Sequence, residues 1–444
     1  MKRSYIKEIK KLVGERVKVK GFIENLRISN HMVFIVLRDI SGKVQITYKR
    51  GTSSETDYLI SHITNDSFIT VEGTILENSH VKMGGIEVML EIMVIESIAE
   101  PLPIVRKELT SNNKKKALEK SSIDQRLNYR WIDLRSEENQ LLLKVQTSLS
   151  HAIRNYLLNK NFIEIHTPKI IKTASESGSD VFEVKYFDEI AYLAQSPQFY
   201  KQMAMASGLE KIFEIGPVFR AEKSYSNRHA TEFTGLDIEI SYIDSYLDVM
   251  RLEEKLLMYV LEQVSDKYKD EIKKLYGHDL IVPTTPFPVI SLSDLYKCLD
   301  EEFGYKIPDN EKNDLTTEAE KLSYDWVKKN YNHEFLFVTD FRPEKRAFYH
   351  MRNENNIPQG YDLIWKGVEI STGAQREHRL ERLKSQAKEK GLIDDVKFYF
   401  DFFRYGCPPH GGFGLGLDRL TMLIFNLNIK EAMFLFRGPS RLTP

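Results

Sequence analysis

The sequence predicts an α+β protein with a small β-barrel at the N-terminus and a larger domain built on an antiparallel sheet flanked by helices. Short alternating apolar runs fill residues 16–95, a polar stretch follows, and strand-like and helical patterns then mix irregularly up to the C-terminus. Because this second part lacks a regular alternation of strand and helix, an antiparallel sheet fits it better than a doubly wound parallel one.

The barrel is predicted from five strand-like runs separated by Gly, Ser and Asn turns. Val17 and Val19 alternate with Lys18 and Lys20, which places apolar groups on one face and charges on the other. Five strands in roughly 80 residues is the size of an OB-fold, whose exposed face commonly binds single-stranded nucleic acid. We assign it to residues 1–100, with another small barrel that binds no ligand as the alternative. The runs are RVKVKGFI, MVFIVLR, KVQITY, FITVEGTIL and IEVMLEIMVI.

A hinge or linker is predicted at residues 101–130, where prolines precede the polar segment SNNKKKALEKSS. The larger domain then covers residues 131–444. Its first helix should be capped by Ser136 and run to about Lys160, because its apolar positions follow the helical period. A later helix is predicted from an Asp244 cap towards Lys267. Residues 268–335 have a helical pattern without chemical landmarks and are interpreted as an insertion.

Composition indicates a soluble protein without a membrane span. The 444 residues are 42% hydrophobic and 29% charged, and no run approaches the roughly 18 apolar residues that a span requires. The start lacks the apolar core of a secretory signal, so we expect a cytoplasmic location. Cys298 and Cys407 stand far apart and outside any CxxC pattern, which argues against a disulfide framework or a structural zinc.

Basic residues gather at the N-terminus, although the formal net charge is only -1. Residues 1–20 hold eight basic side chains and two acidic ones. Because phosphate binding depends on local clusters of Lys and Arg, a nucleic-acid partner is compatible with this composition. A solvated basic face is the alternative interpretation.

A first polar cluster lies in FRAEKSYSNRHATEFTGLDIEIS, residues 219–241, between two strand-like segments. Arginines that converge on one pocket suit a polyphosphate, because the guanidinium fork matches phosphate oxygens. An adjacent phenylalanine offers a face for a nucleotide base. The residues concerned are Arg220, Glu222, Arg228, His229, Glu232, Phe233, Asp237 and Glu239.

A second cluster, GYDLIWKGVEISTGAQREHR at residues 360–379, places Asp362 and Glu369 on neighbouring strand segments, with Arg376 after a turn of small residues. Hard oxygen ligands near phosphate-binding arginines suggest Mg²⁺ that enters with ATP. As isolated acids these two residues would more often be solvated surface charges.

A third cluster, PPHGGFGLGLDRLTML at residues 408–423, is rich in glycine. A Rossmann dinucleotide loop is disfavoured, because the segment lies at the C-terminus and its spacing is GGxGxG. Its glycines instead predict a strand that passes close to a bound ligand. A helix that begins near Leu417 should then present Arg419 to that ligand.

These clusters resemble motifs 2 and 3 of the class II aminoacyl-tRNA synthetases, and FIEIHTPKI at residues 162–170 resembles motif 1. Over the whole chain the sequence is similar to the aspartyl-tRNA synthetases of the archaeal and eukaryotic type, which belong to subclass b. The phrases AQSPQFYKQ (194–202), EFTGLD (232–237), RLNYRWIDLR (126–135) and the terminal RLTP carry this narrower resemblance.

The resemblance implies an antiparallel catalytic sheet and a homodimer formed around motif 1, with Pro168 at the contact. It also implies two reactions: aspartate attacks the α-phosphate of ATP to give aspartyl-adenylate and pyrophosphate, and the aspartyl group then passes to the 3′ end of tRNA-Asp. Neither step needs an enzyme nucleophile, and we find no Ser/His/Asp or Cys/His arrangement in the sequence. Catalysis would rest on positioning and charge stabilisation.

The resemblance also assigns residues to the reactants. Arg220 should hold the α-phosphate, Arg228 and His229 the far phosphates, and Phe233 and Arg419 the two faces of adenine. The catalytic set is Arg220, Glu222 and Arg419, and the magnesium set is Glu369, Thr372 and Asp362. The ATP set is Arg220, Ala221, Glu222, Arg228, His229, Ala230, Phe233, Glu369, Gly416, Leu417, Asp418 and Arg419. The aspartate set is Glu176, Gln195, Ser196, Gln198, Lys201, Arg220, Asp237, Thr372 and Arg376.

Lys201 and Arg376 are expected to pair with the side-chain carboxylate of the amino acid. Aspartate and asparagine are nearly isosteric, so charge must separate them: two buried cations that face a neutral amide would cost several kcal/mol. The magnesium set departs from the family pattern, because serine is more usual where Thr372 stands.

In the barrel, Phe34, Gln45, Lys82 and Glu87 occupy positions where related enzymes bind anticodon bases, as expected for splayed single-stranded RNA. Phe34 by itself would more often be a core residue. Relatives that discriminate at the third anticodon base tend to have a tryptophan near Glu24 and a lysine at Lys82. This chain has only the lysine, so charging of tRNA-Asn in addition to tRNA-Asp stays open.

Three rival functions follow from the same residues. An asparaginyl-tRNA synthetase is disfavoured by Lys201, a catalytically altered paralogue by the retained Arg220, Arg376 and Arg419, and a metabolic ligase that passes activated aspartate to ammonia by the retained barrel.

Overall fold

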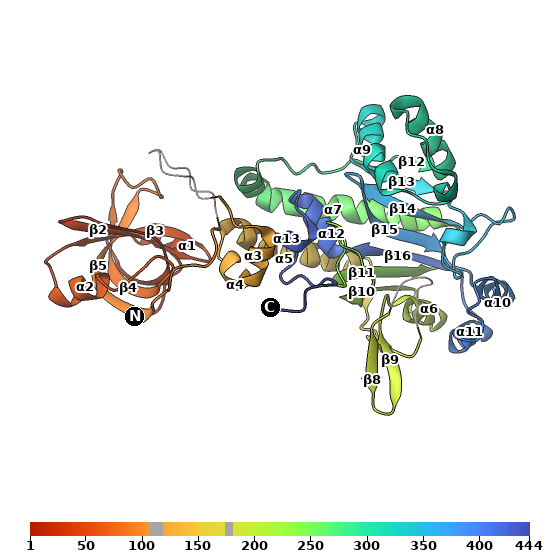
Figure 1. Ribbon diagram of the computed structural model, residues 1–444, viewed down its shortest axis with the longest axis horizontal. Helices are drawn as coiled ribbons and strands as arrows, with labels where there is room; N and C mark the ends of the chain where they lie inside the picture. Colours follow the sequence, from red (N-terminus) through yellow and green to blue (C-terminus); the bar gives the residue numbers. More distant parts are fainter. Residues whose placement is uncertain (107–118, 174–180) are drawn as a thin grey trace. The chain divides into compact units, whose positions relative to one another are not determined.

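The computed structural model describes residues 1–106, 119–173 and 181–444. They fall into two compact units, Met1–Ser121 and Ser122–Pro444. In Figure 1 the first unit is coloured red to orange, and the second runs from orange through green to blue. In the described part of the chain, no helix is long and apolar enough to cross a lipid bilayer.

The first unit is a closed barrel with strand order β1-β2-β3-β5-β4, which confirms the predicted OB-fold. Val33, Ile35 and Leu37 on β2 are fully buried in the barrel, whereas Phe34 between them faces outwards. All five strand-like runs lie inside strands, since each alternates apolar and polar residues as a half-buried strand does. The elements are α1 (Ile6–Ile9), β1 (Arg16–Ile28), β2 (Met32–Asp39), β3 (Gly42–Lys49), α2 (Ser54–Ile60), β4 (Phe68–Glu77) and β5 (Ile86–Ser97).

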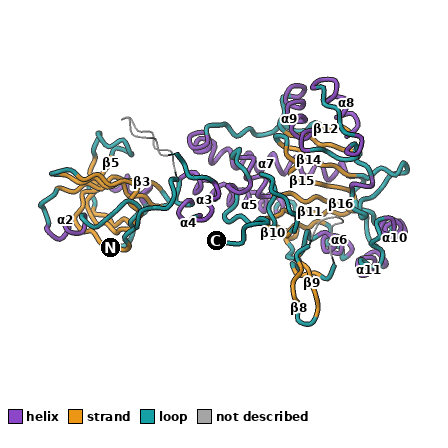
Figure 2. The backbone as a smooth tube through the Cα atoms, viewed as in Figure 1, coloured by secondary structure: helices purple, strands orange, loops and turns teal. Residues whose placement is uncertain are grey.

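The second unit is built on a sheet of order β12-β13-β14-β15-β16-β11-β10-β6. Neighbouring strands are antiparallel from β13 to β10, and only the outer pairs β12/β13 and β10/β6 are parallel. The prediction of a largely antiparallel sheet is therefore confirmed. The strands are β6 (Ile163–Glu164), β10 (Lys211–Phe219), β11 (Glu232–Ser241), β12 (Val289–Ser291), β13 (Phe335–Thr339), β14 (Gly360–Trp365), β15 (Val368–Gln375) and β16 (His410–Gly416). A separate small sheet has the order β7 (Ile170–Ile171), β9 (Glu189–Leu193) and β8 (Glu183–Tyr186). Its strands β8 and β9 form a hairpin that projects from this unit (Figure 2).

Helices surround this sheet, and two of their predicted starts can be compared with the structure. Ser136 caps the first long helix by accepting a hydrogen bond from the Asn139 amide, as predicted. The predicted Asp244 cap is wrong by one residue, because Ser245 makes a capping box with Asp248 and the helix runs to Tyr276. The helices are α5 (Glu137–Leu158), α6 (Gln198–Ala206), α7 (Tyr246–Tyr276), α8 (Leu292–Phe303), α9 (Thr317–Tyr331), α10 (Leu380–Glu389), α11 (Lys397–Arg404), α12 (Leu417–Ile424) and α13 (Ile429–Ala432).

Residues 268–335, interpreted as a helical insertion, contain the end of α7, then β12, α8 and α9. Strand β12 pairs with β13 at the edge of the main sheet. The segment therefore extends the sheet as well as adding helices, and α9 contacts β13, β14 and β15.

The predicted linker 101–130 ends in helical structure that belongs to the second unit, namely α3 (Ile123–Asn128) and α4 (Arg130–Asp133). The Ser122 hydroxyl accepts from the Gln125 amide, and the Gln125 side chain accepts from the Ser122 amide. This capping box starts a helix in a polar segment with weak periodicity, which is why the pattern alone predicted a linker.

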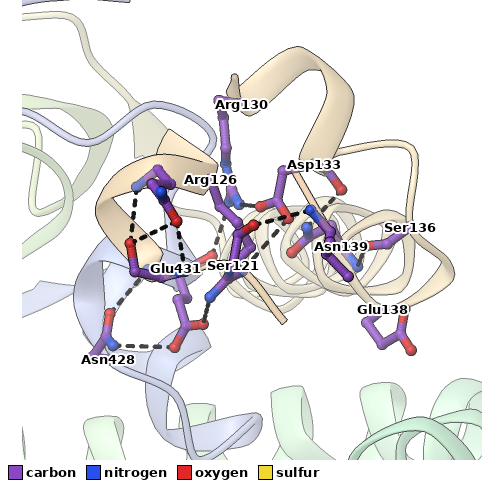
Figure 3. A network of polar contacts seen from close by, with 12 residues as sticks. Ser121, Arg126, Arg130, Asp133, Ser136, Glu138, Asn139, Asn428 and Glu431 are labelled. Atoms are coloured by element: carbon purple, nitrogen blue, oxygen red, sulfur yellow. Dashed lines mark hydrogen bonds and ion pairs between the residues drawn. The ribbon is translucent and has the colours of Figure 1, made fainter. Parts of the chain in front are cut away.

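Buried ion pairs hold α3 and α4 against the C-terminal residues (Figure 3). Arg130, which is 1% exposed, donates to Asp133 at 2.5 Å and to the carbonyl oxygen of Met433 at 2.7 Å. Arg126 donates to Glu431 at 2.5 Å. Since buried charges must be paired and hydrogen-bonded, the segment RLNYRWIDLR serves to anchor the start of this unit.

Candidate active site and barrel face

A cavity of about 300 Å³ lies in the second unit, where β10, β11, β15 and β16 meet the starts of α6 and α12. Most of the predicted site residues line it: Gln195, Ser196, Gln198, Lys201, Arg220, Glu222, Arg228, His229, Ala230, Phe233, Asp237, Glu369, Thr372, Arg376, Gly416, Asp418 and Arg419. Ala221, Glu232, Asp362 and Leu417 are not among its lining residues, and Glu176 lies outside the described residues. The cavity therefore joins segments that are far apart in the chain, from Gln195 to Ile429.

One end of the cavity holds an alternating set of buried charges. Lys201 Nζ on α6 lies 2.9 Å from Asp237 Oδ1 and 3.3 Å from Glu239 Oε2 on β11. Arg376, just after β15, donates from Nε to Glu239 Oε1 at 2.9 Å and from Nη2 to the Gly412 carbonyl at 3.0 Å. Lys201 is 1% exposed and Glu239 is fully buried. Two cations and two carboxylates thus balance at this end.

Glu239 is the part of this end that the sequence did not assign. Burial by itself would raise the pKa of Glu239, but the charges of Arg376 and Lys201 outweigh burial and hold the pKa below its usual value. The sequence predicted that Lys201 and Arg376 pair with the substrate carboxylate. In the structure Glu239 already pairs with both cations. A signal was present, because Asp237 and Glu239 are two apart on one strand and must share a face.

Gly412 on β16 makes room for this network. A Cβ at Gly412 would lie 2.0 Å from the Ile238 carbonyl oxygen and 2.4 Å from Glu239 Oε2. The sequence predicted that the glycines of this segment let a strand approach a ligand. Gly414 and Gly416 line the cavity, but Gly412 instead lets β16 approach β11 and its buried carboxylate.

The other end of the cavity carries three arginines. Arg220 follows β10, and its guanidinium stands 5.6 Å from the centre of the Phe233 ring on the paired strand β11. Among the described residues, the buried Nε of Arg220 has no hydrogen-bond partner. Buried donors in native proteins are usually satisfied, so this orphaned donor points to an anionic ligand.

Arg419 at the start of α12 links the loop after β10 to the strand β15 by hydrogen bonds. It donates to the carbonyl oxygens of Arg228 at 3.2 Å and Glu369 at 2.8 Å. Arg228 in turn forms an ion pair with Glu320 on α9. His229 lies among these arginines, and burial together with their charges lowers the pKa of His229 to about 4. It is therefore neutral at pH 7 unless an anion binds beside it.

The predicted magnesium ligands are partly committed to other contacts. Arg346 binds both carboxylate oxygens of Asp362, at 2.8 and 2.6 Å, so that Asp362 stands behind the cavity wall. The Thr372 hydroxyl lies 2.9 Å from Asp362 and 3.1 Å from Glu369. Burial raises the pKa of Asp362, and the charge of Arg346 offsets part of that rise. No group of three or more His, Cys, Asp or Glu that could hold a metal occurs in the described part of the chain.

Asp418 has a structural contact as well as a place on the cavity wall. Its carboxylate accepts from the Thr234 amide at 2.7 Å and from the Gln146 side chain at 2.8 Å. These bonds join α12 to β11 and α5.

The cavity is also lined by residues that the sequence did not single out, including Lys345, Arg346, Tyr349 and His350 from the loop before β14. Only a general abundance of charge marks that loop in the sequence.

On the barrel, three of the predicted anticodon residues share one outward face. Gln45 on β3 pairs with Glu87 on β5, and Phe34 on β2 pairs with Thr47 on β3. The Glu87 carboxylate accepts from Gln45 at 3.0 Å and from the Thr47 hydroxyl. Burial by itself would raise the pKa of Glu87, but its hydrogen bonds outweigh burial and lower that pKa. The lowered pKa favours the carboxylate form of Glu87, which accepts hydrogen bonds. Together they form a polar platform beside an aromatic ring, which suits unstacked bases.

The structure also places the two barrel positions compared above with discriminating relatives. Lys82 lies in the exposed turn between β4 and β5. Glu24 on β1 forms ion pairs with Arg38, at 3.1 Å, and with Lys43.

Family models match both units of the chain. The model described as "tRNA synthetases class II (D, K and N)" matches residues 122–437, and the "OB-fold nucleic acid binding domain" model matches residues 17–96. The chain belongs to the class II tRNA synthetases, a family of ATP-dependent enzymes that typically use Mg²⁺.

Within that family, the chain is similar over its full length to archaeal aspartate–tRNA ligases. It is 39% identical to the aspartate–tRNA(Asp/Asn) ligase of Aeropyrum pernix, over 98% of this chain and 96% of that one. It is 38% identical to the aspartate–tRNA(Asp) ligase of Pyrococcus furiosus over the whole of both chains.

Solved structures give the same fold. The asparaginyl-tRNA synthetase of Pyrococcus horikoshii in complex with asparaginyl-adenylate superposes with a TM-score of 0.90 at 30% identity and full coverage of both chains. The aspartyl-tRNA synthetase of Entamoeba histolytica gives a TM-score of 0.86 at 30% identity, over 100% of this chain and 93% of that one. The fold alone therefore does not distinguish aspartate from asparagine.

Proposed function

We propose that this chain is an aspartate–tRNA ligase of the cytoplasm. It would activate L-aspartate with ATP and transfer it to the 3′ end of tRNA-Asp. The observation that carries the proposal is the alternating network of Lys201, Asp237, Glu239 and Arg376 at one end of a cavity whose other end holds Arg220, Arg228 and Arg419. One end suits an amino acid with a second carboxylate, and the other suits a nucleotide.

A charge count favours aspartate over asparagine. If the α-ammonium group of the substrate pairs with Asp237, then Lys201 and Arg376 face Glu239 and the substrate β-carboxylate, and the buried charges balance again. Asparagine would leave one buried cation in excess. An uncompensated buried charge costs several kcal/mol, far more than the small difference in shape between the two amino acids.

The first reaction needs an in-line attack of the aspartate α-carboxylate on the α-phosphate. Arg220 would bind both groups and stabilise the charge that develops on the α-phosphate oxygens, a role supported by its place on the cavity wall and by its unpaired Nε. Phe233 would stack on adenine, while Arg228, His229 and Arg419 would bind the phosphates that leave as pyrophosphate. Glu222, half-buried beside them, would orient adenine or the tRNA terminus.

Magnesium fits the cavity as a companion of ATP. Glu369 and Thr372 supply hard oxygen donors on the wall, and Mg²⁺ commonly takes only one or two protein ligands beside phosphate oxygens and water. The ion would neutralise phosphate charge when bound. Asp362, held by Arg346, would act behind Thr372 by accepting a hydrogen bond from its hydroxyl group, which leaves the hydroxyl lone pairs for the ion.

The tRNA would be bound by the barrel face of Phe34, Gln45 and Glu87 at its anticodon, with Lys82 beside it.

We further propose a homodimer formed around the segment FIEIHTPKI. Ile163 and Ile170 in this segment are 46% and 47% exposed, so they offer apolar surface to a second copy.

Charging of purified tRNA-Asp and tRNA-Asn transcripts with labelled aspartate tests the proposal. We expect tRNA-Asp to be charged, and the response of tRNA-Asn decides whether the enzyme discriminates between them. ATP–pyrophosphate exchange with aspartate and with asparagine provides the companion measurement. Exchange that depends on asparagine and not on aspartate would replace this proposal with the asparagine enzyme.

Phe34→Ala is expected to lower kcat/KM for tRNA by about tenfold or more, because stacking of one base on an aromatic ring contributes roughly 1–3 kcal/mol. ATP–pyrophosphate exchange should not change, since Phe34 belongs to the barrel and not to the cavity. Aminoacylation at varied tRNA concentration measures the effect. Tyr58→Ala is the control, because Tyr58 is a 65% exposed aromatic residue of the same barrel on α2. Equal losses in both variants would argue against a specific role for Phe34.

A further inference from the structure

Glu320 on α9 is a buried carboxylate with no role in the function proposed above. It is 4% exposed and belongs to the segment 268–335, which the sequence marked only as an insertion. It is not among the residues that line the cavity. A buried acid outside a site requires partners, and the partners of Glu320 are all parts of the nucleotide end.

The contacts of Glu320 join two separate walls of the cavity. Its Oε2 atom pairs with Nη1 of Arg228 and also accepts from the backbone amide of Glu369 at 3.2 Å. The neighbouring Thr317 hydroxyl accepts from Nη2 of Arg228 at 3.2 Å. Both terminal nitrogens of Arg228 are therefore held by the first turn of α9.

Arg419 completes the arrangement from the opposite side. It donates to the carbonyl oxygens of Arg228 and Glu369, the same two residues that Glu320 holds by a side chain and an amide. Arg228 is thus fixed at its guanidinium and its carbonyl group, and the backbone of Glu369 at both its amide and its carbonyl group. The loop after β10 and the strand β15 are locked together at the phosphate end.

We propose that Glu320 is a positioning residue for the triphosphate end of ATP, acting through Arg228 and Glu369. This inference rests on the proposed function, because it assumes that the arginine end binds the nucleotide. An arginine side chain loses considerable rotamer entropy when it is immobilised, and a carboxylate that holds it in advance removes that cost from ligand binding. Arg220 and Arg419 also line the cavity, so this end carries positive charge besides that of Arg228, which pairs with Glu320.

The opposite role would be competition, in which Glu320 withholds Arg228 from the phosphates. The two roles predict effects of opposite sign. Removing a positioning group weakens binding of ATP, whereas removing a competitor strengthens it. AMP separates the phosphate end from the rest of the site, because it has adenine, ribose and the α-phosphate but lacks the two phosphates that Arg228 would bind.

Calorimetric titration with ATP, in the presence of Mg²⁺, and with AMP tests the proposal. For Glu320→Ala we expect ATP to bind about five- to tenfold more weakly, as for one long side chain left free, with AMP binding unchanged. Glu320→Gln should fall between Glu320→Ala and the wild type, because its amide oxygen still accepts. Glu318→Ala is the matched control, since Glu318 lies on the same helix with an exposed side chain that pairs with the exposed Lys321, at 3.7 Å.

Unchanged or tighter ATP binding in Glu320→Ala would overturn the proposal, and so would an equal loss for ATP and AMP. Thr317→Val keeps the test decisive if Glu320→Ala does not fold. It removes the second acceptor of Arg228 and should weaken ATP binding about two- to threefold, again without an effect on AMP. Failure of the proposed function would instead show in the wild type, as absence of aspartate-dependent pyrophosphate exchange in a protein that still binds ATP.

Discussion

Replacing Lys201 by methionine is expected to lower kcat/KM for aspartate in pyrophosphate exchange by roughly 10²- to 10³-fold, since removing one partner of a buried charge pair costs about 2–5 kcal/mol. Lys201 is 1% exposed and bridges the carboxylates of Asp237 and Glu239. Without it, Glu239 and the incoming β-carboxylate would share the single charge of Arg376, because Asp237 would pair with the α-ammonium group of the substrate. Asparagine, which adds no negative charge, should suffer a smaller loss, so the preference for aspartate should narrow.

Two controls separate this effect from a loss of folding. Lys211→Met changes an exposed lysine at the start of β10 and should leave exchange unaltered. Calorimetric titration of Lys201→Met with ATP should give nearly wild-type binding, because Lys201 lies at the opposite end of the cavity from Arg220, Arg228 and Arg419. Full activity with aspartate in Lys201→Met would remove the physical basis of the substrate assignment.

Local patterns predicted most of the framework. Period-two alternation marked all five barrel strands, since a strand with one buried face must alternate. The Ser136 cap followed from a helical period that begins just after it. The starts at Ser122 and Ser245 were missed or displaced because neighbouring polar residues offer more than one possible cap, and only the final packing selects among them.

The pairing of charges could not be predicted in this way. Glu239 lies 137 residues from Arg376, and Glu320 lies 92 residues from Arg228. No periodicity connects such partners, so an acid in a helix like α9 has the same sequence pattern whether it is solvated or buried against an active site. Asp362 shows the reverse case, because the sequence places it near Glu369, while the partner that occupies it, Arg346, comes from a loop without any pattern.

Arg220→Ala is expected to reduce kcat for adenylate formation by roughly 10³-fold, with a smaller effect on ATP affinity. Loss of one preorganised donor to developing charge typically costs about 10²–10³ in kcat, and Arg220 offers a bidentate fork. Its Nε is buried without a partner among the described residues, so no hydrogen bond of that atom has to break when substrate arrives. Rapid-quench measurement of aspartyl-adenylate separates this loss from effects on tRNA charging.

The comparison with Arg220→Lys makes this prediction specific to geometry. A lysine keeps the charge but is a compact cation that cannot form the fork or stack a planar group on the Phe233 ring, so we expect it to recover little of the lost rate. Arg251→Ala, which removes an exposed arginine of α7, should behave like the wild type. Substantial rescue by lysine would show that Arg220 contributes charge alone, and the orphaned Nε would then have no part in stabilising the transition state.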